Sequence, residues 1–190
     1  LAFAQKDIAR RGWAIECRIN AEDPVRGFLP STGRLIVFRP PAASLQAGTP
    51  VPAGTPGVRV DTGVYEGGEI AIHYDSMICK LIACGADRTA AIATMRDALN
   101  GFVVRGVASN LAFQSALLGH PRFAAGDFTT GFIAEEFAQG FDPGAIAHPE
   151  REFLLALAAA LERRLLARSI RLTGQLAGHE LCIGERFVVV

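Results

Sequence analysis

The chain has 190 residues, half of them hydrophobic, and its 19 basic and 19 acidic residues give a formal net charge of zero. This length allows one good hydrophobic core, or one domain and part of another. The balanced charge gives no sign of a nucleic-acid or acidic-membrane partner. No apolar run approaches the roughly 20 residues needed to span a bilayer, so no membrane partner is expected.

The first predicted strand, opened by Gly12, has two very different faces. A period of two gathers its apolar side chains on one face, which we expect to belong to the core: Trp13, Ile15, Cys17 and Ile19. The opposite face carries Glu16, Arg18 and Asn20. The sequence therefore predicts a polar sheet face with one arginine on a rigid strand.

Two interpretations of Arg18 follow from the residues alone. A guanidinium fixed on a strand suits a planar anion, because its fork presents paired donors and does not deprotonate. The alternative is an ion pair with Glu16 or Glu22 on a solvated sheet face. Spacing by itself favours the ion pair.

A turn at residues 28–33 leads into a second predicted strand over residues 34–39. Residues 40–57 hold five prolines and three glycines, which is typical of an exposed loop.

Two β-rich runs follow, at residues 58–65 and 69–74, and Gly67-Gly68 between them predicts a β-hairpin. Asp75 and Ser76 form a bend into an apolar strand over residues 77–84.

Helical patterns come next. Asp87 is a good cap for a helix whose apolar residues recur at 3–4 spacing: Ile92, Met95, Leu99 and Phe102. Ser109 or Asn110 caps a second helix that Gly119 ends, and Thr129-Thr130 begins a third. Strands followed by helices predict an α+β domain over residues 1–138.

A linker is expected over residues 139–148, and Pro149 then suits the first turn of a long helix to about Arg168. Alternation predicts strands over residues 169–175 and 180–190, so that 149–190 is the beginning of a second, β-containing domain. The chain starts without methionine and stops inside an apolar run, so we expect a piece of a longer protein.

Other chemistry has little support. The sequence has no glycine loop that opens a helix to cradle phosphate and no nucleophile elbow. Its four histidines are scattered, so no metal site is predicted, and its four cysteines form no Cys-x-x-Cys pair. We expect these cysteines to be reduced core residues. The residues alone support an anion-facing arginine and little else.

Four motifs, taken together and in order, resemble the carboxy-terminal domain of biotin carboxylases over residues 1–138. They are GWAIECRINAEDP at 12–24, FLPSTG at 28–33, VRVDTGVYEG at 58–67 and HYDSMICKLI at 73–82. The region from residue 149 is similar to the start of the subunit-contacting domain of propionyl-CoA carboxylase α subunits. That second resemblance implies a truncated, antiparallel β-barrel-like domain after the long helix.

The resemblance implies that Arg18 is catalytic and contacts both bicarbonate and the ureido oxygen of biotin. The family uses ATP to activate bicarbonate as carboxyphosphate, which then supplies CO2 to biotin N1. A preorganised guanidinium stabilises the negative charge that develops on the ureido oxygen. The resemblance thus reverses the preference for a simple ion pair at Arg18.

Three other positions carry weaker implications. Arg59 matches an arginine at the subunit interface of dimeric bacterial relatives, and the alternative is an exposed strand charge. Asp75 matches an acid near the site, yet it also fits an ordinary Asp turn. Thr130 matches a residue that flanks the ATP adenine, although a threonine there is also a common helix cap. Lys80 interrupts an apolar run and needs a partner or a route to solvent.

The expected function is therefore that of a fragment of an ATP-dependent biotin carboxylase, a ligase, within an acyl-CoA (propionyl-CoA-like) carboxylase α subunit. Carrier-bound biotin, ATP and Mg2+ are the implied cofactors, but their ligands lie mostly outside this chain. The implied partners are the biotin carboxyl carrier domain and a carboxyltransferase β subunit, in a hetero-oligomer of the bacterial cytoplasm or mitochondrial matrix.

Two alternatives stay open. The chain could serve as a non-catalytic assembly module that docks a carboxyltransferase subunit. It could also belong to an acetyl-CoA, methylcrotonyl-CoA, pyruvate or urea carboxylase, because the carboxylase half does not select the acceptor.

Overall fold

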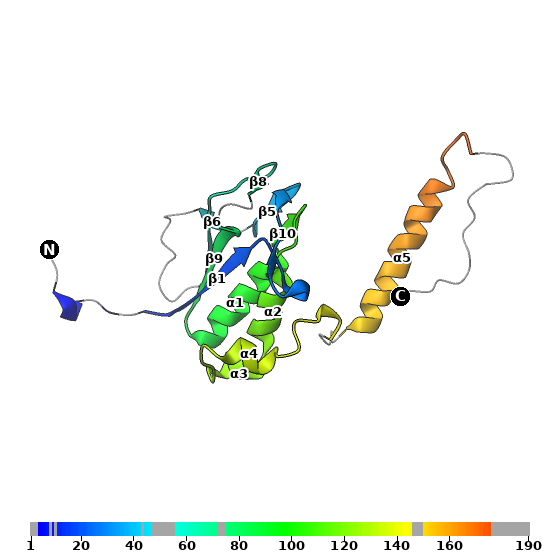
Figure 1. Cartoon of the computed structure of the whole chain (residues 1–190). Coiled ribbons are helices and arrows are strands. Elements are labelled where there is room, and N and C mark those ends of the chain that lie inside the picture. Colours follow the sequence, from blue (N-terminus) through cyan, green and yellow to red (C-terminus); the bar gives the residue numbers. More distant parts are fainter. Residues whose placement is uncertain are drawn as a thin grey trace. The chain divides into compact units, whose positions relative to one another are not determined.

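The computed structural model describes residues 4–7, 9, 11–42, 44–46, 56–71, 75–145 and 150–175. The chain divides into two compact units, Leu1–Pro143 and Gly144–Val190, whose helices and strands are labelled in Figure 1. The first unit combines antiparallel sheets with helices, which confirms the α+β prediction. Each unit is described by itself below.

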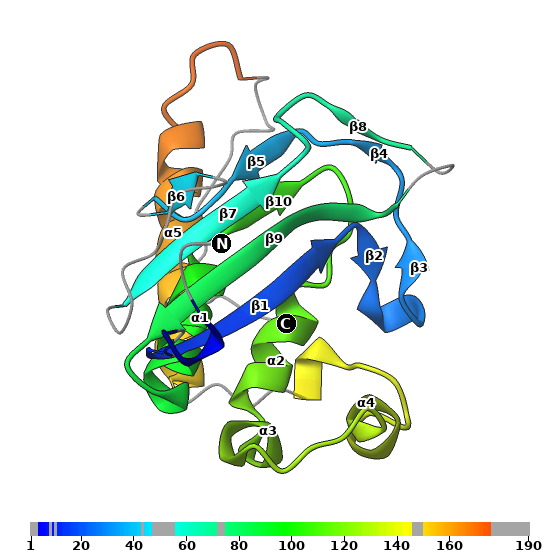
Figure 2. The ribbon, with the colours of Figure 1, turned by 90° about the vertical axis from the view of Figure 1, so that its left-hand side faces the viewer.

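The main sheet of the first unit has four strands in the order β1-β9-β7-β6, visible in Figure 2. Their bounds are β1 (Trp13–Asn20), β9 (Met77–Gly85), β7 (Gly57–Thr62) and β6 (Leu45–Gln46). Strand β9 is antiparallel to both β1 and β7, and β6 is parallel to β7. The predicted strands that became β1, β7 and β9 are confirmed, whereas β6 falls within the stretch predicted as an exposed loop. Strand β1 lies at an edge of the sheet.

Three two-stranded sheets extend this unit. They pair β2 (Glu22–Asp23) with β3 (Leu29–Pro30), β4 (Gly33–Arg34) with β8 (Glu69–Ile70), and β5 (Val37–Arg39) with β10 (Val103–Arg105). The single strand predicted over residues 34–39 is therefore divided in two. Leu35 lies between the parts and is fully buried, so the chain changes sheet there.

The predicted β-hairpin across Gly67 and Gly68 is wrong. The first run, β7, pairs with β9 and β6, whereas β8 pairs with β4. The turn is real, since the Gly68 amide donates to the Tyr65 carbonyl at 3.0 Å. The Gly67 amide also donates to the Leu35 carbonyl, and the Gly68 carbonyl accepts from the Leu35 amide. The turn is therefore bonded to the segment between β4 and β5, and it does not join two paired strands.

The helices of the first unit are α1 (Arg88–Asn100), α2 (Leu111–Gly119), α3 (Pro121–Ala125) and α4 (Phe132–Glu136), with short 3-10 turns η1 (Gln5–Asp7) and η2 (Pro24–Arg26). A third 3-10 turn, η3 (Pro143–Ala145), spans the boundary between the two units. The Asp87 side chain accepts from the Ala90 amide at 2.8 Å, so the predicted cap of α1 is confirmed. Helix α3, which begins at Pro121, had no counterpart in the predicted elements.

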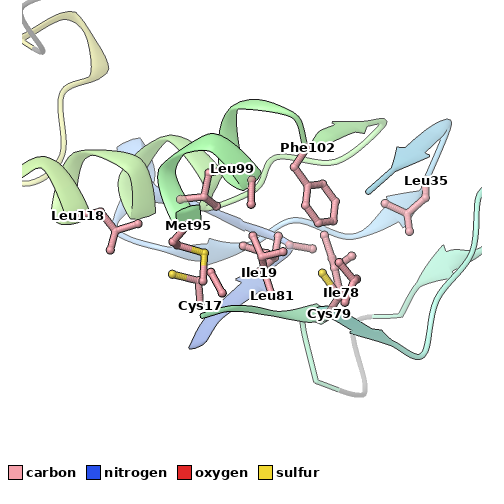
Figure 3. Close-up of a cluster of buried hydrophobic side chains, with 14 of the residues drawn as sticks. Cys17, Ile19, Leu35, Ile78, Cys79, Leu81, Met95, Leu99, Phe102 and Leu118 are labelled. Carbon is pink, nitrogen blue, oxygen red and sulfur yellow. The ribbon is translucent and has the colours of Figure 1, made fainter. Parts of the chain in front are cut away.

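The hydrophobic core lies between α1 and the main sheet (Figure 3). Side chains of β1, β9, α1 and α2 meet there, among them Ile19, Leu81, Met95 and Leu118, all of which are at most 1% exposed. Trp13 departs from the predicted core face, because it is 49% exposed. It pairs with Gly85 at the very end of β9, and no strand flanks it on the outer edge of β1 within the described residues.

The described part of the second unit is dominated by α5 (Arg151–Ser169), which confirms the long predicted helix. Its four predicted stripe leucines are all at least 43% exposed: Leu154, Leu157, Leu161 and Leu165. The strand predicted over residues 169–175 is wrong, because the helix runs on to Ser169 and a turn follows it. The strand predicted over residues 180–190 lies outside the described residues.

A membrane-crossing segment was also sought. In the described ranges, every helix is too short or too polar to traverse a bilayer.

Candidate functional site

The face of the main sheet that points away from α1 carries the charged residues of the candidate site. Strand register places Arg18 opposite Lys80, and Lys80 opposite Asp61, in one row across β1, β9 and β7. Residues that stand opposite each other in antiparallel strands project to the same side. The neighbouring row on the other face is Cys17, Leu81 and Val60, all buried, so the predicted division of β1 into two faces is confirmed at its centre. This side of the sheet faces the viewer in Figure 2.

Arg18 holds its guanidinium largely in the open. Its side chain is 65% exposed, and its Nε lies 3.7 Å from Oε1 of Glu16, which is too long for a hydrogen bond. An ion pair at this distance and exposure adds little stability. No described residue accepts a hydrogen bond from the Arg18 side chain, so its donors are available to a ligand.

The second ion pair considered for Arg18 does not form. Glu22 instead accepts hydrogen bonds from Asn20 Nδ2 at 3.1 Å and from Ser76 Oγ at 2.8 Å. The Ala21 amide donates to the Ser76 carbonyl at 2.7 Å. Glu22 therefore joins the end of β1 to the beginning of β9, and it leaves Arg18 free.

The backbone of Arg18 is held from the outer edge of β1 by residues at the start of α2. Asn110 Nδ2 donates to the Arg18 carbonyl at 3.0 Å, and Gln114 Nε2 donates to the same oxygen at 3.4 Å. Asn110 Oδ1 also accepts from the Asn20 amide at 3.0 Å, and the Asn110 amide donates to the Asn20 carbonyl at 3.2 Å. One buried residue thus occupies the edge where a further strand would pair.

Asn110 was predicted only as a candidate helix cap. It does occupy the N-cap position of α2, but its side chain makes no capping hydrogen bond to the helix. It is 5% exposed, which is unusual for asparagine. The apolar residues around it in sequence were the available signal, since a buried amide there needs partners from elsewhere.

Asp75 forms the ordinary turn that was the alternative to a role in the site. Its Oδ1 accepts from the Met77 amide at 3.0 Å, which fixes the entry into β9. Asp75 also lines a cavity of about 520 Å³ together with Asp61, Glu69 and Lys80. Lys80, half-buried in the sheet, opens into this cavity, which answers why a lysine interrupts the apolar run.

Arg59 is paired within its own strand. Its Nε lies 3.0 Å from Asp61 Oδ1, and its Nη2 donates to Asp61 Oδ2 at 3.1 Å, with both side chains 29% exposed. Register places Arg59 opposite Ile82, which is two residues from Lys80 along β9 and on the same face. The Arg59 charge is therefore largely balanced by Asp61 on the same sheet face.

Thr130 lies in an exposed turn just before α4. The neighbouring Thr129 makes the local turn, because its Oγ1 accepts from the Gly131 amide at 3.1 Å. Over the described ranges, no hydrogen bond connects Thr130 with the residues around Arg18. The sheet register brings Arg18, Lys80 and Asp61 into one row, and Asp75 shares a cavity with Lys80 and Asp61. Thr130 lies on a separate element.

An ion-pair cluster holds α3 against α4. Arg122 Nη1 contacts Glu135 at 3.0 Å and also contacts Glu136, while Arg122 Nε lies 3.5 Å from Asp127. His120 Nε2 lies 3.2 Å from Glu136. The hydrogen bond from Arg122, with smaller contributions from the charges of Arg122 and His120, lowers the pKa of Glu136 below its ordinary value of 4.5.

The cysteines of the sheet are chemically quiet. Burial raises the pKa of Cys17 and of Cys79 to about 12, and the nearby Glu16 charge adds to the shift at Cys17. Both are buried thiols, as predicted, whereas Cys84 is half-buried on the opposite face. Cys182 lies outside the described residues. Within those residues, no group of three or more His, Cys, Asp or Glu side chains converges as a metal site.

Comparison with known proteins gives a consistent family. The model of the "Biotin carboxylase C-terminal domain" matches residues 16–135. The propionyl-CoA carboxylase alpha chain of Ruegeria pomeroyi is 46% identical over 197 residues, covering 100% of this chain and 29% of the relative. The mitochondrial propionyl-CoA carboxylase alpha chain of Homo sapiens is 42% identical over 162 residues, covering 85% of this chain and 21% of the relative.

Solved structures agree. The biotin carboxylase domain dimer of Hydrogenobacter thermophilus 2-oxoglutarate carboxylase, in complex with MgADP, ADP and bicarbonate, is 36% identical with a TM-score of 0.61. The matched region covers 71% of this chain and 27% of the solved chain. The chain spans less than a third of the length of each of these relatives.

Proposed function

Because this chain belongs to the family of biotin carboxylase C-terminal domains, we propose that it supplies the Arg18 wall of the active site of an ATP-dependent biotin carboxylase. The longer protein would be a ligase of the acyl-CoA carboxylase type, similar to the propionyl-CoA carboxylase α subunits. Residues 1–138 form the carboxylase part, 139–148 a linker, and 149–190 the start of a β-barrel-like domain that contacts the carboxyltransferase.

The observation that supports this function best is the exposed guanidinium of Arg18, whose only ion pair among the described residues is the 3.7 Å contact with Glu16. It stands on a rigid strand, has open donors and has Lys80 beside it across the register. A planar anion such as bicarbonate can accept two parallel hydrogen bonds from this fork. The relative from Hydrogenobacter was solved with bicarbonate, which is consistent with an anion of this class.

Arg18 then has two tasks in the reaction. It binds and orients bicarbonate, and it stabilises the negative charge that develops on the ureido oxygen of carrier-bound biotin. Biotin itself supplies the nitrogen that accepts the carboxyl group. The strand that carries Arg18 is held before the charge appears, by β9 and by Asn110, which reduces the reorganisation needed in the transition state.

The described residues were also compared with the needs of the other implied cofactors. They contain no convergent acidic cluster of the kind that holds Mg2+. The family resemblance puts the ligands of ATP and Mg2+ mostly outside this chain. Carrier-bound biotin and bicarbonate are the groups that Arg18 and its surroundings fit.

The remaining assignments are secondary. We assign Asp75 to the surroundings of the site, and the cavity that it lines together with Lys80 supports this assignment. Arg59 contributes to a subunit interface, and Thr130 flanks the nucleotide, both by analogy with family positions. The partners are the biotin carboxyl carrier domain and a carboxyltransferase β subunit, within the bacterial cytoplasm or mitochondrial matrix.

Substitution of Arg18 in the full-length subunit tests this function. Because the side chain is 65% exposed and lies outside the core, Arg18→Ala and Arg18→Lys should fold like the wild type. Both should lose biotin carboxylation by at least about a hundredfold in kcat, since lysine lacks the planar fork. Arg96→Ala, an exposed arginine of α1, is the matched control. A near-normal rate with bicarbonate and biotin in Arg18→Ala would refute the assignment.

A second function, in assembly, is favoured by one observation. The leucine stripe of α5 is exposed along its length, although an amphipathic helix normally buries such a stripe. A carboxyltransferase β subunit is the partner that the family offers. Co-purification of this chain with that subunit should be lost in a Leu157→Glu, Leu161→Glu variant and kept in an Arg164→Glu variant. Equal recovery from all three would exclude the helix as the contact.

A further inference from the structure

We propose that Asn110 is a positioning residue for Arg18, which it holds in place through the backbone of β1. This inference rests on the proposed function of Arg18. Asn110 does not touch the open face of the sheet. It bonds to the backbone of Arg18 at the outer edge of β1. Its three hydrogen bonds to Arg18 and Asn20 are all between 3.0 and 3.2 Å.

The need for such a residue follows from the place of β1 in the sheet. Strand β1 is an edge strand, so only one of its sides pairs with β9. The backbone groups of Arg18 and Asn20 that bond to Asn110 point to the other side. These outward backbone groups would otherwise lack a protein partner, and those of Asn20 lie in a half-buried position. The register also shifts between Ile19 and Asn20, so the ladder is irregular one residue from Arg18. Asn110 ties the strand down at that irregularity.

The chemistry of asparagine suits this task closely. The carboxamide presents one acceptor and one donor side by side, which match the outward amide of Asn20 and carbonyl of Arg18. Serine offers one short hydroxyl, and leucine offers neither group. Gln114 reinforces only the carbonyl, at the longer distance of 3.4 Å. An ordinary helix cap would have kept its side chain on the helix, which Asn110 does not do.

The consequence for catalysis is geometric. If the Arg18 carbonyl lost its donors, the strand end could shift, and the guanidinium would move with it. A mutation far from the chemistry that displaces a catalytic group by about 1 Å can reduce the rate by about a hundredfold. We therefore expect Asn110 variants to lose kcat between about tenfold and about a hundredfold, with a smaller change in KM for ATP.

Asn110→Asp in the full-length subunit is the decisive variant, because the aspartate side chain has nearly the same size and shape as that of asparagine. At pH 8 its carboxylate still accepts from the Asn20 amide, but it repels the Arg18 carbonyl instead of donating to it. When the buried carboxyl is protonated, its O–H can donate again, so the ratio of variant to wild-type kcat should rise as the pH falls. Asn100→Asp, exposed at the end of α1, is the matched control and should show a constant ratio.

A double-mutant cycle with Arg18→Ala separates positioning from general damage. If Asn110 acts through Arg18, Asn110→Asp should lower the rate in the wild-type background and leave the rate of Arg18→Ala unchanged. Additive losses, or a ratio that does not depend on pH, would overturn the inference while the proposed function stands. If Arg18→Ala itself keeps the wild-type rate, the proposed function fails first and this inference with it.

A structural readout on the 190-residue chain completes the test. Amide hydrogen exchange at Asn20 should be protected in the wild type and in Gln114→Leu, and fast in Asn110→Ala. Slow exchange at Asn20 in Asn110→Ala would show that other groups hold the strand end, which would overturn the inference directly.

Discussion

Arg18 and Lys80 stand directly opposite each other on β1 and β9, on the face of the sheet that turns away from the core. Two cations in adjacent register attract an anion more strongly than either does alone. Asp61, opposite Lys80 on β7, is already engaged with Arg59 and so offsets them only in part. Glu16 lies 3.7 Å from Arg18, and Glu69 and Asp75 line the cavity beside Lys80, so carboxylates surround the two cations. The structure therefore places a second cation, Lys80, beside the arginine that the sequence indicated.

Replacement of Lys80 should weaken anion binding more than it slows the chemistry. In the full-length subunit we expect Lys80→Met to raise KM for bicarbonate by between about threefold and about tenfold, with kcat nearly unchanged, because a half-buried methionine keeps the apolar stem. Steady-state kinetics at low ionic strength measure this. Lys6→Met, exposed in η1, is the control. An unchanged KM for bicarbonate would remove Lys80 from the site.

The turn at Asp75 should be separable from its charge. Asp75→Ala loses the acceptor of the Met77 amide and should reduce the free energy of unfolding by roughly 0.5 to 1 kcal/mol. Asp75→Asn keeps that acceptor and should lose less. Urea denaturation of the chain measures both. If the two variants lost equal stability, the carboxylate charge and not the turn would be the contribution.

The thiols should differ sharply in reactivity. With a pKa of about 12, Cys17 and Cys79 have a thiolate fraction of about one in ten thousand at pH 8. In a Cys182→Ser background, a thiol reagent should therefore label Cys84 first and label the other two only after unfolding. Mass spectrometry of the labelled peptides identifies the sites. Early labelling of Cys17 or Cys79 would contradict the core described here.

Acid should weaken the α3–α4 cluster through Glu136. Its pKa is lowered in the folded state, so its contribution to stability is complete above about pH 4.5 and disappears as the pH falls through the folded value. The melting temperature of the wild type should therefore fall more between pH 5 and pH 3 than that of Glu136→Gln. Glu162→Gln, exposed on α5, should follow the wild type. Parallel curves for all three proteins would show that Glu136 is not linked to folding.

Local patterns predicted the elements whose structure is decided locally. The alternation in β1 separated Cys17 and Ile19 from Arg18, and Asp87 with Ile92 and Met95 marked the start and the buried side of α1. Strand pairing was less accessible, because partners lie far apart in sequence. The sequence of β7 does not indicate that this strand pairs with β9 rather than with β8.

The site shows the same division. Periodicity was sufficient to aim Arg18 away from the core, and the family motifs supplied the chemistry. Asn110 escaped notice because asparagine before a helix has a common local explanation, and only the fold brings it to β1. The strand predicted over residues 169–175 failed for a related reason, since the alternation after Ser169 forms a turn where no described strand offers a pair.

The amide bridge at Asn110 has a second effect that concerns solubility. An open sheet edge is a template for strand addition by another polypeptide, and natural proteins protect such edges. Asn110 occupies the outward carbonyl of Arg18 and both outward backbone groups of Asn20, so a foreign strand cannot extend the ladder past this part of β1. The residue that holds the backbone of Arg18 therefore also protects the edge of β1 against β-augmentation, and loss of that side chain should favour self-association through this edge.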